Sequence, residues 1–322
     1  MRYYTLDAIR GIGAISVLLF HMGLVWHIAP YGYLAVDVFF ALSGFVMAMT
    51  YERDLKFGMT VGQFYTLRLE RLYPTYLIGL GLGTIVIAAK VSAGTDWPSP
   101  WILFNVAMLP APVTGDFFPV NVPAWSLFFE LIAYACFAVA IRVRSSTLVL
   151  VMVVSACVLV THGGIRNVGS TWTEFPLGLA RLGLAFPLGW LLWRWNVRPW
   201  ELPAALHRPA KFLGDMSYPL YVIHYPLLSP LQLLLGRYHL AGPLPAIAIV
   251  VLLVVVAGFL AHLMSRRAEH LQEQDDGHKE AVATHPDLDD VVQRLRRAQS
   301  GRPPNRRRRE RRPRQCRQWR RS

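Results

Sequence analysis

Apolar runs long enough to cross a membrane dominate this sequence. A membrane-spanning helix needs about 20 consecutive, mostly apolar residues. Eight runs of roughly that length occur at 11–29, 31–51, 72–91, 122–141, 147–162, 175–195, 212–235 and 243–264. They predict an all-α, polytopic integral membrane bundle with about eight spans.

A ninth apolar run, at 101–113, is short and ends in Pro110 and Pro112. Non-helical backbone at membrane depth is tolerated where protein surrounds it. We therefore expect this run to form a re-entrant or half-spanning piece that is buried in the bundle and does not cross the membrane.

The composition supports a membrane protein and excludes several other classes. Of the 322 residues, 54% are apolar and 16% are charged, whereas soluble domains average about 45–50% and about 25%. This excludes an ordinary soluble enzyme and a disordered protein. The three cysteines (Cys136, Cys157 and Cys316) are far apart and show no metal-type spacing with histidine. We therefore expect neither a disulfide framework nor a metal site.

The last part of the chain differs from the rest. Residues 266–322 hold 17 of the 33 basic and 9 of the 20 acidic residues, a net charge of +8. Such a segment cannot bury a core, so we expect a disordered, Arg-rich cytoplasmic tail after a transmembrane domain at 1–265. The tail can rest on anionic membrane lipids. A pI near 10 indicates a nucleic-acid partner when the positive charge covers a soluble fold. In this chain about half of the basic residues lie in the tail, and many of the others flank apolar runs. We therefore expect no nucleic-acid partner.

Basic residues flank the apolar runs unevenly. If the N-terminus is inside and the ninth run does not cross, one side of the membrane collects Arg53, Lys56, Arg68, Arg71, Arg142, Arg144, Arg194, Arg198, Arg208, Lys211, Arg266 and Arg267. The loops on the other side are poor in basic residues. The positive-inside rule then predicts eight spans with both termini in the cytoplasm.

Ionisable side chains inside apolar runs are costly and are functional candidates by default. This chain places several there, among them His21, Asp37, Glu130, Arg181, Asp215 and His224. Arg10 and His21 are eleven residues apart, a spacing that returns to the same helix face within about 20° and separates them by about 16 Å along the axis. This arrangement suits an anion anchor at the surface and a base deeper inside. A snorkelling arginine and a structurally satisfied histidine are the alternative.

Glu130 lies one helical turn after Ser126, so both share a helix face. A buried carboxylate needs a partner or takes up a proton, and Arg10, Arg181 or His21 could serve as that partner. A structural ion pair is the alternative to a catalytic role.

Arg68 and Arg71 lie one helical turn apart, just before the third apolar run. Two guanidinium groups at that spacing suit phosphate, although simple contact with lipid head groups fits as well.

Other apolar runs hold further candidates. Pro219 should kink a helix on which Tyr218 and His224 could line a polar cavity. Asp37 could be structural, and Ser43-Gly44 indicates a close helix–helix approach.

Six short motifs follow one another along residues 1–265. They are Leu6-Asp7-Ala8-Ile9-Arg10-Gly11 with His21; Val36-Asp37-Val38-Phe39-Phe40-Ala41-Leu42-Ser43-Gly44-Phe45; Arg68-Leu69-Glu70-Arg71-Leu72-Tyr73-Pro74; Trp125-Ser126-Leu127 with Glu130; Arg181 with Gly189; and Ser217-Tyr218 through Tyr221 to His224. In this order they resemble the signatures of the membrane acyltransferase family usually called acyltransferase 3. Its members include O-acetyltransferases of bacterial surface polysaccharides.

The resemblance implies an O-acyltransferase of the bacterial cytoplasmic (inner) membrane. It would move an acyl group, expected to be acetyl, from acyl-CoA to a hydroxyl of a cell-surface or exported carbohydrate, with no bound cofactor. His21 would act as general base, with Glu130 orienting it or a nearby arginine. Arg10, Arg68 and Arg71 would hold the donor. A covalent acyl-His21 intermediate is a second possibility.

The chain departs from the family in two places. The family commonly has about ten spans, and the missing pair would fall between 195 and 212. The last family helix usually leads into a Glu-x-Pro element, whereas Glu269 is followed here by His270 and Leu271.

Two other functions fit the same sequence. A transporter or flippase for a glycan or lipid-linked precursor would use midplane charges and broken helices, but no inverted repeat is visible. A non-catalytic subunit of such a pathway would tolerate loss of His21.

Overall fold

The computed structural model describes residues 2–26, 29–92, 94, 100–112, 115–237 and 243–283. Apart from an isolated β-bridge between Asp116 and Thr171, every regular element in these ranges is helical. The α-helices are α1 (Tyr4–Trp26), α2 (Ala35–Phe57), α3 (Val61–Ser92), α4 (Trp125–Val139), α5 (Ser145–Thr161), α6 (Phe175–Arg194), α7 (His207–Arg237) and α8 (Pro243–Ala283). Short 3₁₀ helices are η1 (Gly32–Leu34), η2 (Pro100–Ala107), η3 (Val122–Ala124), η4 (Trp172–Glu174) and η5 (Ala204–Leu206).

Each of the eight predicted apolar runs is helical over most of its length, which confirms the all-α bundle. Within the described ranges, six helical segments are long and apolar enough to cross a membrane: Tyr4–Met22, Gly32–Phe57, Val61–Ser92, Val122–Val139, Trp172–Arg194 and Leu244–Arg266. Helix α5, with 17 residues, is shorter, and α7 is not among the six. The predicted count of eight spans therefore has six clear members.

Two boundaries differ from the sequence-based expectation. Helix α3 begins at Val61 and continues through Pro74, so Arg68 and Arg71 lie inside a long helix and not on a segment that leads into one. Helix α8 continues to Ala283, so the first part of the expected disordered tail is helical. Residues 266–283 are rich in Ala, Glu, Gln, Arg and Lys, which favour helix. The rest of the tail lies outside the described residues.

The ninth apolar run forms η2 followed by a turn. The Asn105 side chain is fully buried there and donates hydrogen bonds to the carbonyls of Leu109 and Phe117, at 3.1 and 3.0 Å. The Tyr76 hydroxyl donates to the Asn105 carbonyl. These bonds satisfy backbone carbonyls of an irregular segment. The expectation that this segment is buried in the bundle is wrong for most of its side chains, because Trp101, Leu103, Phe104, Val106 and Leu109 are exposed. Of the side chains described in this segment, only Asn105, Met108, Pro110 and Ala111 turn into the protein.

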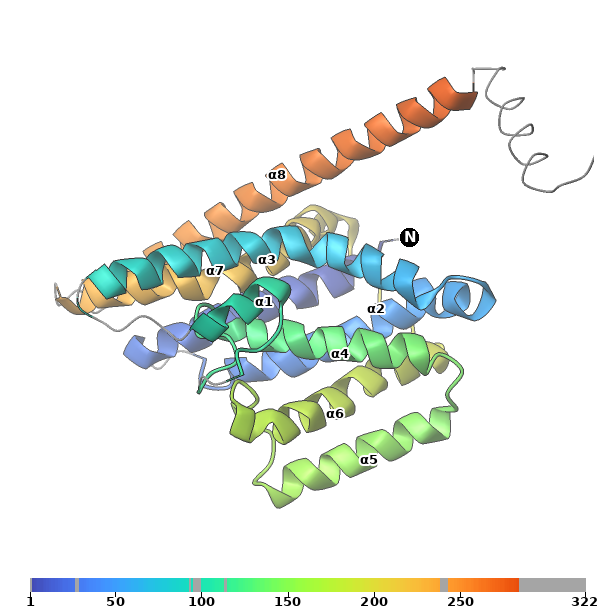
Figure 1. The fold of residues 1–322 in the computed structure, drawn as a ribbon, viewed down its shortest axis with the longest axis horizontal. Helices are drawn as coiled ribbons and strands as arrows, with labels where there is room; N and C mark the ends of the chain where they lie inside the picture. The colour runs from blue at the N-terminus through green and yellow to red at the C-terminus, as the bar shows by residue number, and fades with distance from the viewer. Residues whose placement is uncertain are drawn as a thin grey trace, which may run out of the picture. The chain divides into compact units, whose positions relative to one another are not determined.

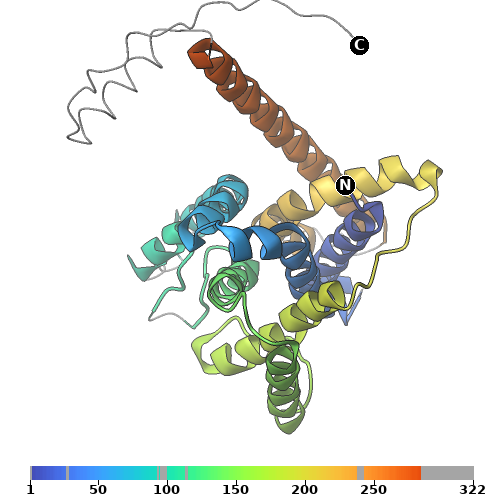
Figure 2. The same ribbon diagram turned by 90° about the vertical axis from the view of Figure 1, so that its right-hand side faces the viewer.

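The helices pack in pairs (Figure 1). Helix α1 lies along α7, α2 lies along α6, and α3 also contacts α7. One apolar core joins side chains of α2, α3, α4 and α6, and a second joins α1, α7 and the first part of α8. Helix α5 lies at the margin of the bundle in both ribbon views, where it packs on α6 (Figure 2).

Glycines permit the closest approach, between α2 and α6. A Cβ atom on Gly44 would lie 2.0 Å from the Phe186 carbonyl oxygen, and one on Gly189 would lie 1.8 Å from the Ala41 carbonyl oxygen. Neither position can hold a larger residue without moving a helix. The close approach predicted at Ser43-Gly44 is therefore confirmed.

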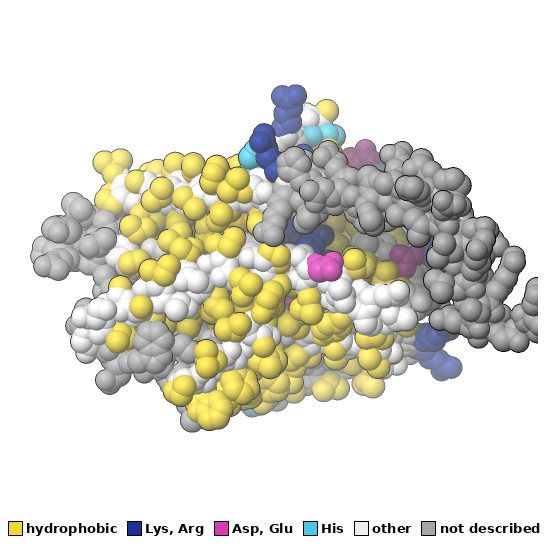
Figure 3. All heavy atoms as spheres, turned by 45° about the horizontal axis from the view of Figure 1, so that its top comes forward, with side chains coloured by type: hydrophobic (Ala, Val, Ile, Leu, Met, Phe, Trp, Pro, Cys, Tyr) yellow, Lys and Arg dark blue, Asp and Glu magenta, His cyan; other side chains and the backbone are white. Residues whose placement is uncertain are grey.

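The surface separates by polarity. Exposed apolar side chains cover α5 and the part of α8 before Met264, as expected for surfaces that face lipid. In Figure 3, hydrophobic side chains gather over the left and middle parts of the face in view, and the visible Lys, Arg, Asp and Glu side chains lie from its middle to its right-hand end.

Three of the basic segments assigned to one side of the membrane meet at one end of the bundle. Arg142 Nη2 donates to the Lys56 carbonyl oxygen at 3.2 Å, and Arg194 Nη1 donates to the Val143 carbonyl oxygen at 2.7 Å. The α2–α3 turn, the α4–α5 turn and the end of α6 are thus adjacent. The prediction that this end is cytoplasmic rests on the positive-inside rule.

Candidate functional site: an arginine-lined pocket and a histidine pair

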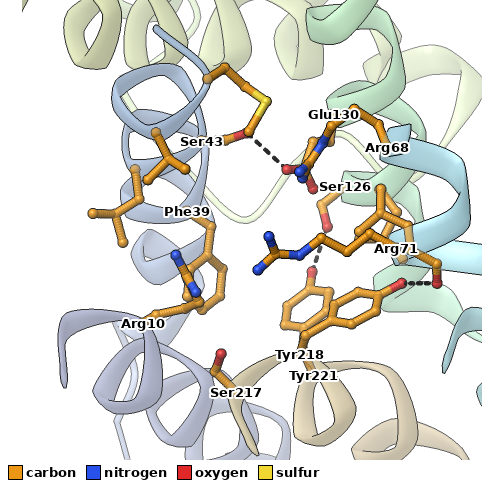
Figure 4. Close-up of a pocket in the computed structure, with 15 residues that line it drawn as sticks. Arg10, Phe39, Ser43, Arg68, Arg71, Ser126, Glu130, Ser217, Tyr218 and Tyr221 are labelled. Carbon is orange, nitrogen blue, oxygen red and sulfur yellow. Dashed lines mark hydrogen bonds between the residues drawn. The ribbon is translucent and has the colours of Figure 1, made fainter. Parts of the chain in front are cut away.

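A pocket of about 150 Å³ lies among five helices (Figure 4). At about 10–15 Å³ for each water, it has room for roughly ten water molecules. Its lining comes from α1, α2, α3, α4 and α7, and consists of Arg10, Phe39, Leu42, Ser43, Val46, Met47, Arg68, Arg71, Leu72, Ser126, Leu127, Glu130, Ser217, Tyr218 and Tyr221. Six of the ten site residues predicted from the sequence are therefore brought together.

Three arginines line this pocket. Arg10 comes from α1 and lies 3.8 Å from the Asp7 carboxylate, one turn earlier. Arg68 and Arg71 come from α3, and the guanidinium groups of Arg10 and Arg71 both point into the space between the helices in Figure 4. With one carboxylate, Glu130, on the same lining, the pocket carries three positive charges against one negative charge.

Arg68 is held more firmly than a surface arginine. It is 6% exposed, its Nη2 donates to the Tyr134 hydroxyl at 2.9 Å, and its guanidinium lies 4.9 Å from the centre of the Tyr134 ring. Its Nε atom is buried without a hydrogen-bond partner in the described structure. A buried donor without a partner costs about 1–3 kcal/mol, so Arg68 has a donor to offer to an anionic ligand.

Glu130 accepts hydrogen bonds from Ser43, at 2.8 Å, and from the hydroxyl of Tyr134. We expected a direct partner among Arg10, Arg181 and His21, but none of the ion pairs among the described residues includes Glu130. Glu130 instead reaches Arg68 through Tyr134.

Tyr134 is a site residue that the sequence reasoning missed. It is fully buried between Glu130 and Arg68. The available signal was its spacing of one helical turn from Glu130, which puts both side chains on one face of α4.

Hydroxyl groups also line the pocket, next to Arg71 in Figure 4. The Tyr218 hydroxyl donates to the Leu72 carbonyl oxygen at 2.7 Å. Ser126 and Tyr221 share a hydrogen bond of 2.7 Å, and the Tyr221 hydroxyl also lies 3.0 Å from the Pro123 carbonyl oxygen. Ser126 and Glu130 share a helix face, as predicted, but each is bonded to a different neighbour.

His21 and His224 lie outside this pocket, and the structure brings them together. The closest ring atoms, His224 Nε2 and His21 Nδ1, are 3.2 Å apart, and the ring centres are 5.0 Å apart. His224 is fully buried. The predicted separation of Arg10 and His21 along a single helix holds, because α1 is continuous from Tyr4 to Trp26.

Asp37 and Arg181 form an ion pair away from the pocket. Arg181 Nη2 donates to Asp37 Oδ2 at 2.8 Å and Nε donates to Oδ1 at 3.0 Å. Arg181 is 0% exposed and also donates to the carbonyls of Val168 and Tyr33. This geometry ties α6 to α2, to η1 and to the loop before η4, and it fits a structural role for both residues.

No group of three or more His, Cys, Asp or Glu side chains that could hold a metal ion occurs among the described residues. The polar groups of the pocket are guanidinium, hydroxyl and carboxylate groups. They are suited to binding an anion and to holding a polar substrate.

Comparisons with known proteins agree with the motifs. The family model for an acyltransferase domain, that of acyltransferase 3, matches residues 3–206. The chain is 38% identical over 178 residues to protein 2 in the picA locus of Rhizobium radiobacter, covering 49% of this chain and 93% of that protein. No solved structure matches the chain.

Two further relatives are matched over a smaller share of their length. The exopolysaccharide production protein ExoZ of Rhizobium meliloti (strain 1021) is 32% identical over 124 residues, 38% of each chain. Acyltransferase MdmB of Streptomyces mycarofaciens is 29% identical over 155 residues, 42% of this chain and 38% of that protein. The matched family model, the motif order and the helices long enough to cross a membrane together assign this multi-pass membrane protein to the acyltransferase 3 family of acyltransferases.

Proposed function

We propose that this protein transfers an acyl group, acetyl in the simplest case, from acyl-CoA to a hydroxyl of a cell-surface or exported carbohydrate. The observation that carries the proposal is the convergence of Arg10, Arg68 and Arg71 on one pocket with a single opposing carboxylate. A carbohydrate acceptor is supported by the relative that is named for exopolysaccharide production.

The three arginines suit the phosphate groups of CoA. A guanidinium group binds phosphate through paired, charge-assisted hydrogen bonds. Arg68 is held by Tyr134 and keeps its Nε donor free among its described neighbours. Arg10 and Arg71 point into the same space from two helices. The donor would therefore be anchored at the end of the bundle that the basic loops assign to the cytoplasm.

His21 is the proposed general base. It lies about 16 Å farther along α1 than Arg10, so the thioester arm of the donor would extend from the arginines toward the histidine. His21 takes the proton of the acceptor hydroxyl as the hydroxyl oxygen attacks the thioester carbonyl carbon. The C–O bond forms, the C–S bond breaks, and His21 returns its proton to the leaving thiolate. The products are an ester and free CoA.

The proposal places the protein in a bacterial cytoplasmic membrane, with both termini inside. Acyl-CoA is a cytoplasmic metabolite, and the basic loops at one end of the bundle would face it under the positive-inside rule. No cofactor is needed, because the thioester already supplies an activated acyl group. Membrane lipids surround the bundle, and nucleic acid has no role.

The test uses membrane vesicles that contain the full chain, acetyl-CoA labelled with ¹³C in the acetyl group, and carbohydrate extracted from the source bacterium. Wild type should give labelled acetyl esters, detected by mass spectrometry. His21→Ala should give none while remaining in the membrane at the wild-type amount. His162→Ala, a change at an exposed histidine at the end of α5, is the control and should match wild type. Transfer by His21→Ala at the wild-type rate would overturn the assigned base.

A further inference from the structure

The contact between His21 and His224 fixes which nitrogen of each ring carries a proton. Tautomers are assigned from the hydrogen-bond network around the ring. His224 Nδ1 lies 2.7 Å from the Tyr221 carbonyl oxygen and 3.1 Å from the Leu220 carbonyl oxygen. Carbonyl oxygens only accept, so His224 Nδ1 must carry the proton. In the neutral ring, His224 Nε2 is then an acceptor.

The same reasoning applies to His21. Its Nδ1 lies 2.9 Å from the Val17 carbonyl oxygen and 3.2 Å from His224 Nε2. Both neighbours are acceptors, so Nδ1 carries a proton that is shared between them. The opposite arrangement, with a proton on His224 Nε2, would put ring lone pairs against carbonyl oxygens at both histidines. The neutral His21 ring therefore has its lone pair on Nε2.

Aromatic neighbours hold the His21 ring in this orientation. Phe20 and Tyr225 pack nearly perpendicular to it, with ring centres 5.2 and 5.5 Å away. Among the residues whose side chains the structure describes, His21 Nε2 has no hydrogen-bond partner. The imidazole atom left to take a substrate proton is Nε2.

We infer that His224 is a positioning residue that holds His21 as the Nδ1–H tautomer, presents Nε2 as the base, and stabilises the imidazolium formed when Nε2 takes a proton. The inference rests on the proposed function of His21. In a Ser-His-Asp triad, the buried aspartate accepts the Nδ1–H of the catalytic histidine, fixes its tautomer and stabilises the imidazolium. His224 would do the same for His21. Here the acceptor is the neutral imidazole of His224, which is fully buried in α7.

Two substitutions separate positioning from packing. In His224→Gln, the side-chain carbonyl oxygen can occupy about the place of Nε2 and accept the His21 proton. In His224→Asn, the shorter amide reaches only the place of Nδ1, so its acceptor is lost from His21. We expect kcat to fall about 100-fold in His224→Asn and to recover to within about tenfold of wild type in His224→Gln, with the KM for acetyl-CoA unchanged in both.

Gln232→Leu is the matched control. Gln232 Nε2 donates to the backbone carbonyl of His21 at 3.0 Å, so the change removes a contact between the same two helices without touching the imidazole. Its kcat should stay within twofold of wild type. Equal losses in all three variants would mean that α1–α7 packing alone matters and would overturn the inference.

A direct readout does not depend on turnover. Nitrogen-15 NMR of histidine-labelled full-length protein in lipid nanodiscs, with His21 assigned by comparison with His21→Ala, reports the tautomer. Wild type should show Nδ1–H, and His224→Asn should show a shift toward Nε2–H. A His21 proton on Nε2 in wild type would overturn the inference. If wild type shows Nδ1–H but transfers no acetyl group, the pairing stands and the proposed function fails.

Discussion

The guanidinium of Arg68 donates to the hydroxyl of Tyr134 at 2.9 Å, and that hydroxyl also bonds to Glu130. A tyrosine thus links the buried carboxylate of α4 to an arginine of α3 that lines the pocket. Because the link passes through a hydroxyl group, Glu130 can hold Arg68 in place without neutralising it by direct pairing.

Tyr134→Phe should release Arg68 while leaving the packing of the ring intact. A hydrogen bond to a charged group contributes about 1.5–3 kcal/mol, so we expect the KM for acetyl-CoA to rise about tenfold with little change in kcat. Tyr65→Phe is the control. The Tyr65 hydroxyl, on α3, donates to the Leu131 carbonyl oxygen of α4, the helix that carries Tyr134, but Tyr65 does not line the pocket. Steady-state kinetics in vesicles measures both. An unchanged KM in Tyr134→Phe would separate Arg68 from donor binding.

Arg71→Ala should weaken donor binding directly. Removing one charge-assisted contact to phosphate corresponds to a KM increase of about 10- to 100-fold for acetyl-CoA. Arg53→Ala is the control, at an exposed position near the end of α2. It tests whether the loss of any basic charge at the end of the bundle assigned to the cytoplasm has the same effect. We expect it to leave the KM for acetyl-CoA unchanged. An unchanged dependence on donor concentration in Arg71→Ala would argue against its role.

Arg181 should be required for stability. Breaking a buried ion pair by removing one partner costs about 3–5 kcal/mol, and Arg181→Ala would also leave the carbonyls of Val168 and Tyr33 without their donor. We expect a large drop in the thermal midpoint of the detergent-solubilised protein. Asp37→Leu combined with Arg181→Met should recover part of that loss, because no unpaired charge remains. Wild-type stability of Arg181→Ala would contradict the structural role.

Gly189→Ala should disrupt the contact between α2 and α6. The added methyl group would lie 1.8 Å from the Ala41 carbonyl oxygen, so the helices must separate. Gly81→Ala is the matched control, because nothing lies within 4 Å of a Cβ atom there; it should be neutral or slightly stabilising. The amount and thermal midpoint of the purified proteins distinguish the two. Equal behaviour of both variants would contradict the close approach.

Truncation after Arg267 tests the basic tail. The pocket, the histidine pair and the helices long enough to cross a membrane all lie before this point. We expect the shortened protein to keep most of its transferase activity in vesicles. A complete loss of transfer at normal membrane abundance would assign the tail a direct part in the reaction.

Properties written in local sequence were predictable. Apolar runs of about 20 residues located the helices, and the one-turn spacing of Arg68 and Arg71 indicated that both could face one ligand; both line the pocket. The small residue Gly44 marked the contact between α2 and α6. In each case the cause lies within a few helical turns, so periodicity and residue size suffice.

Partners supplied by distant helices were not predictable. Nothing in α4 indicates that Glu130 binds Ser43 of α2 in place of an arginine, and nothing in α1 indicates that His21 meets a histidine about 200 residues later. These pairs depend on which helix faces lie together. The helical start of α3 was missed because polar residues before Leu72 end the apolar run without ending the helix.

The central claim is that this chain acylates a carbohydrate hydroxyl with His21 as the base. Proton NMR of surface polysaccharide measures this directly in a deletion strain complemented with wild type, His21→Ala or His162→Ala. We predict that deletion removes the acetyl signal, and that wild type and His162→Ala restore it while His21→Ala does not. An acetyl signal that is unchanged by deletion, or fully restored by His21→Ala, would contradict the account.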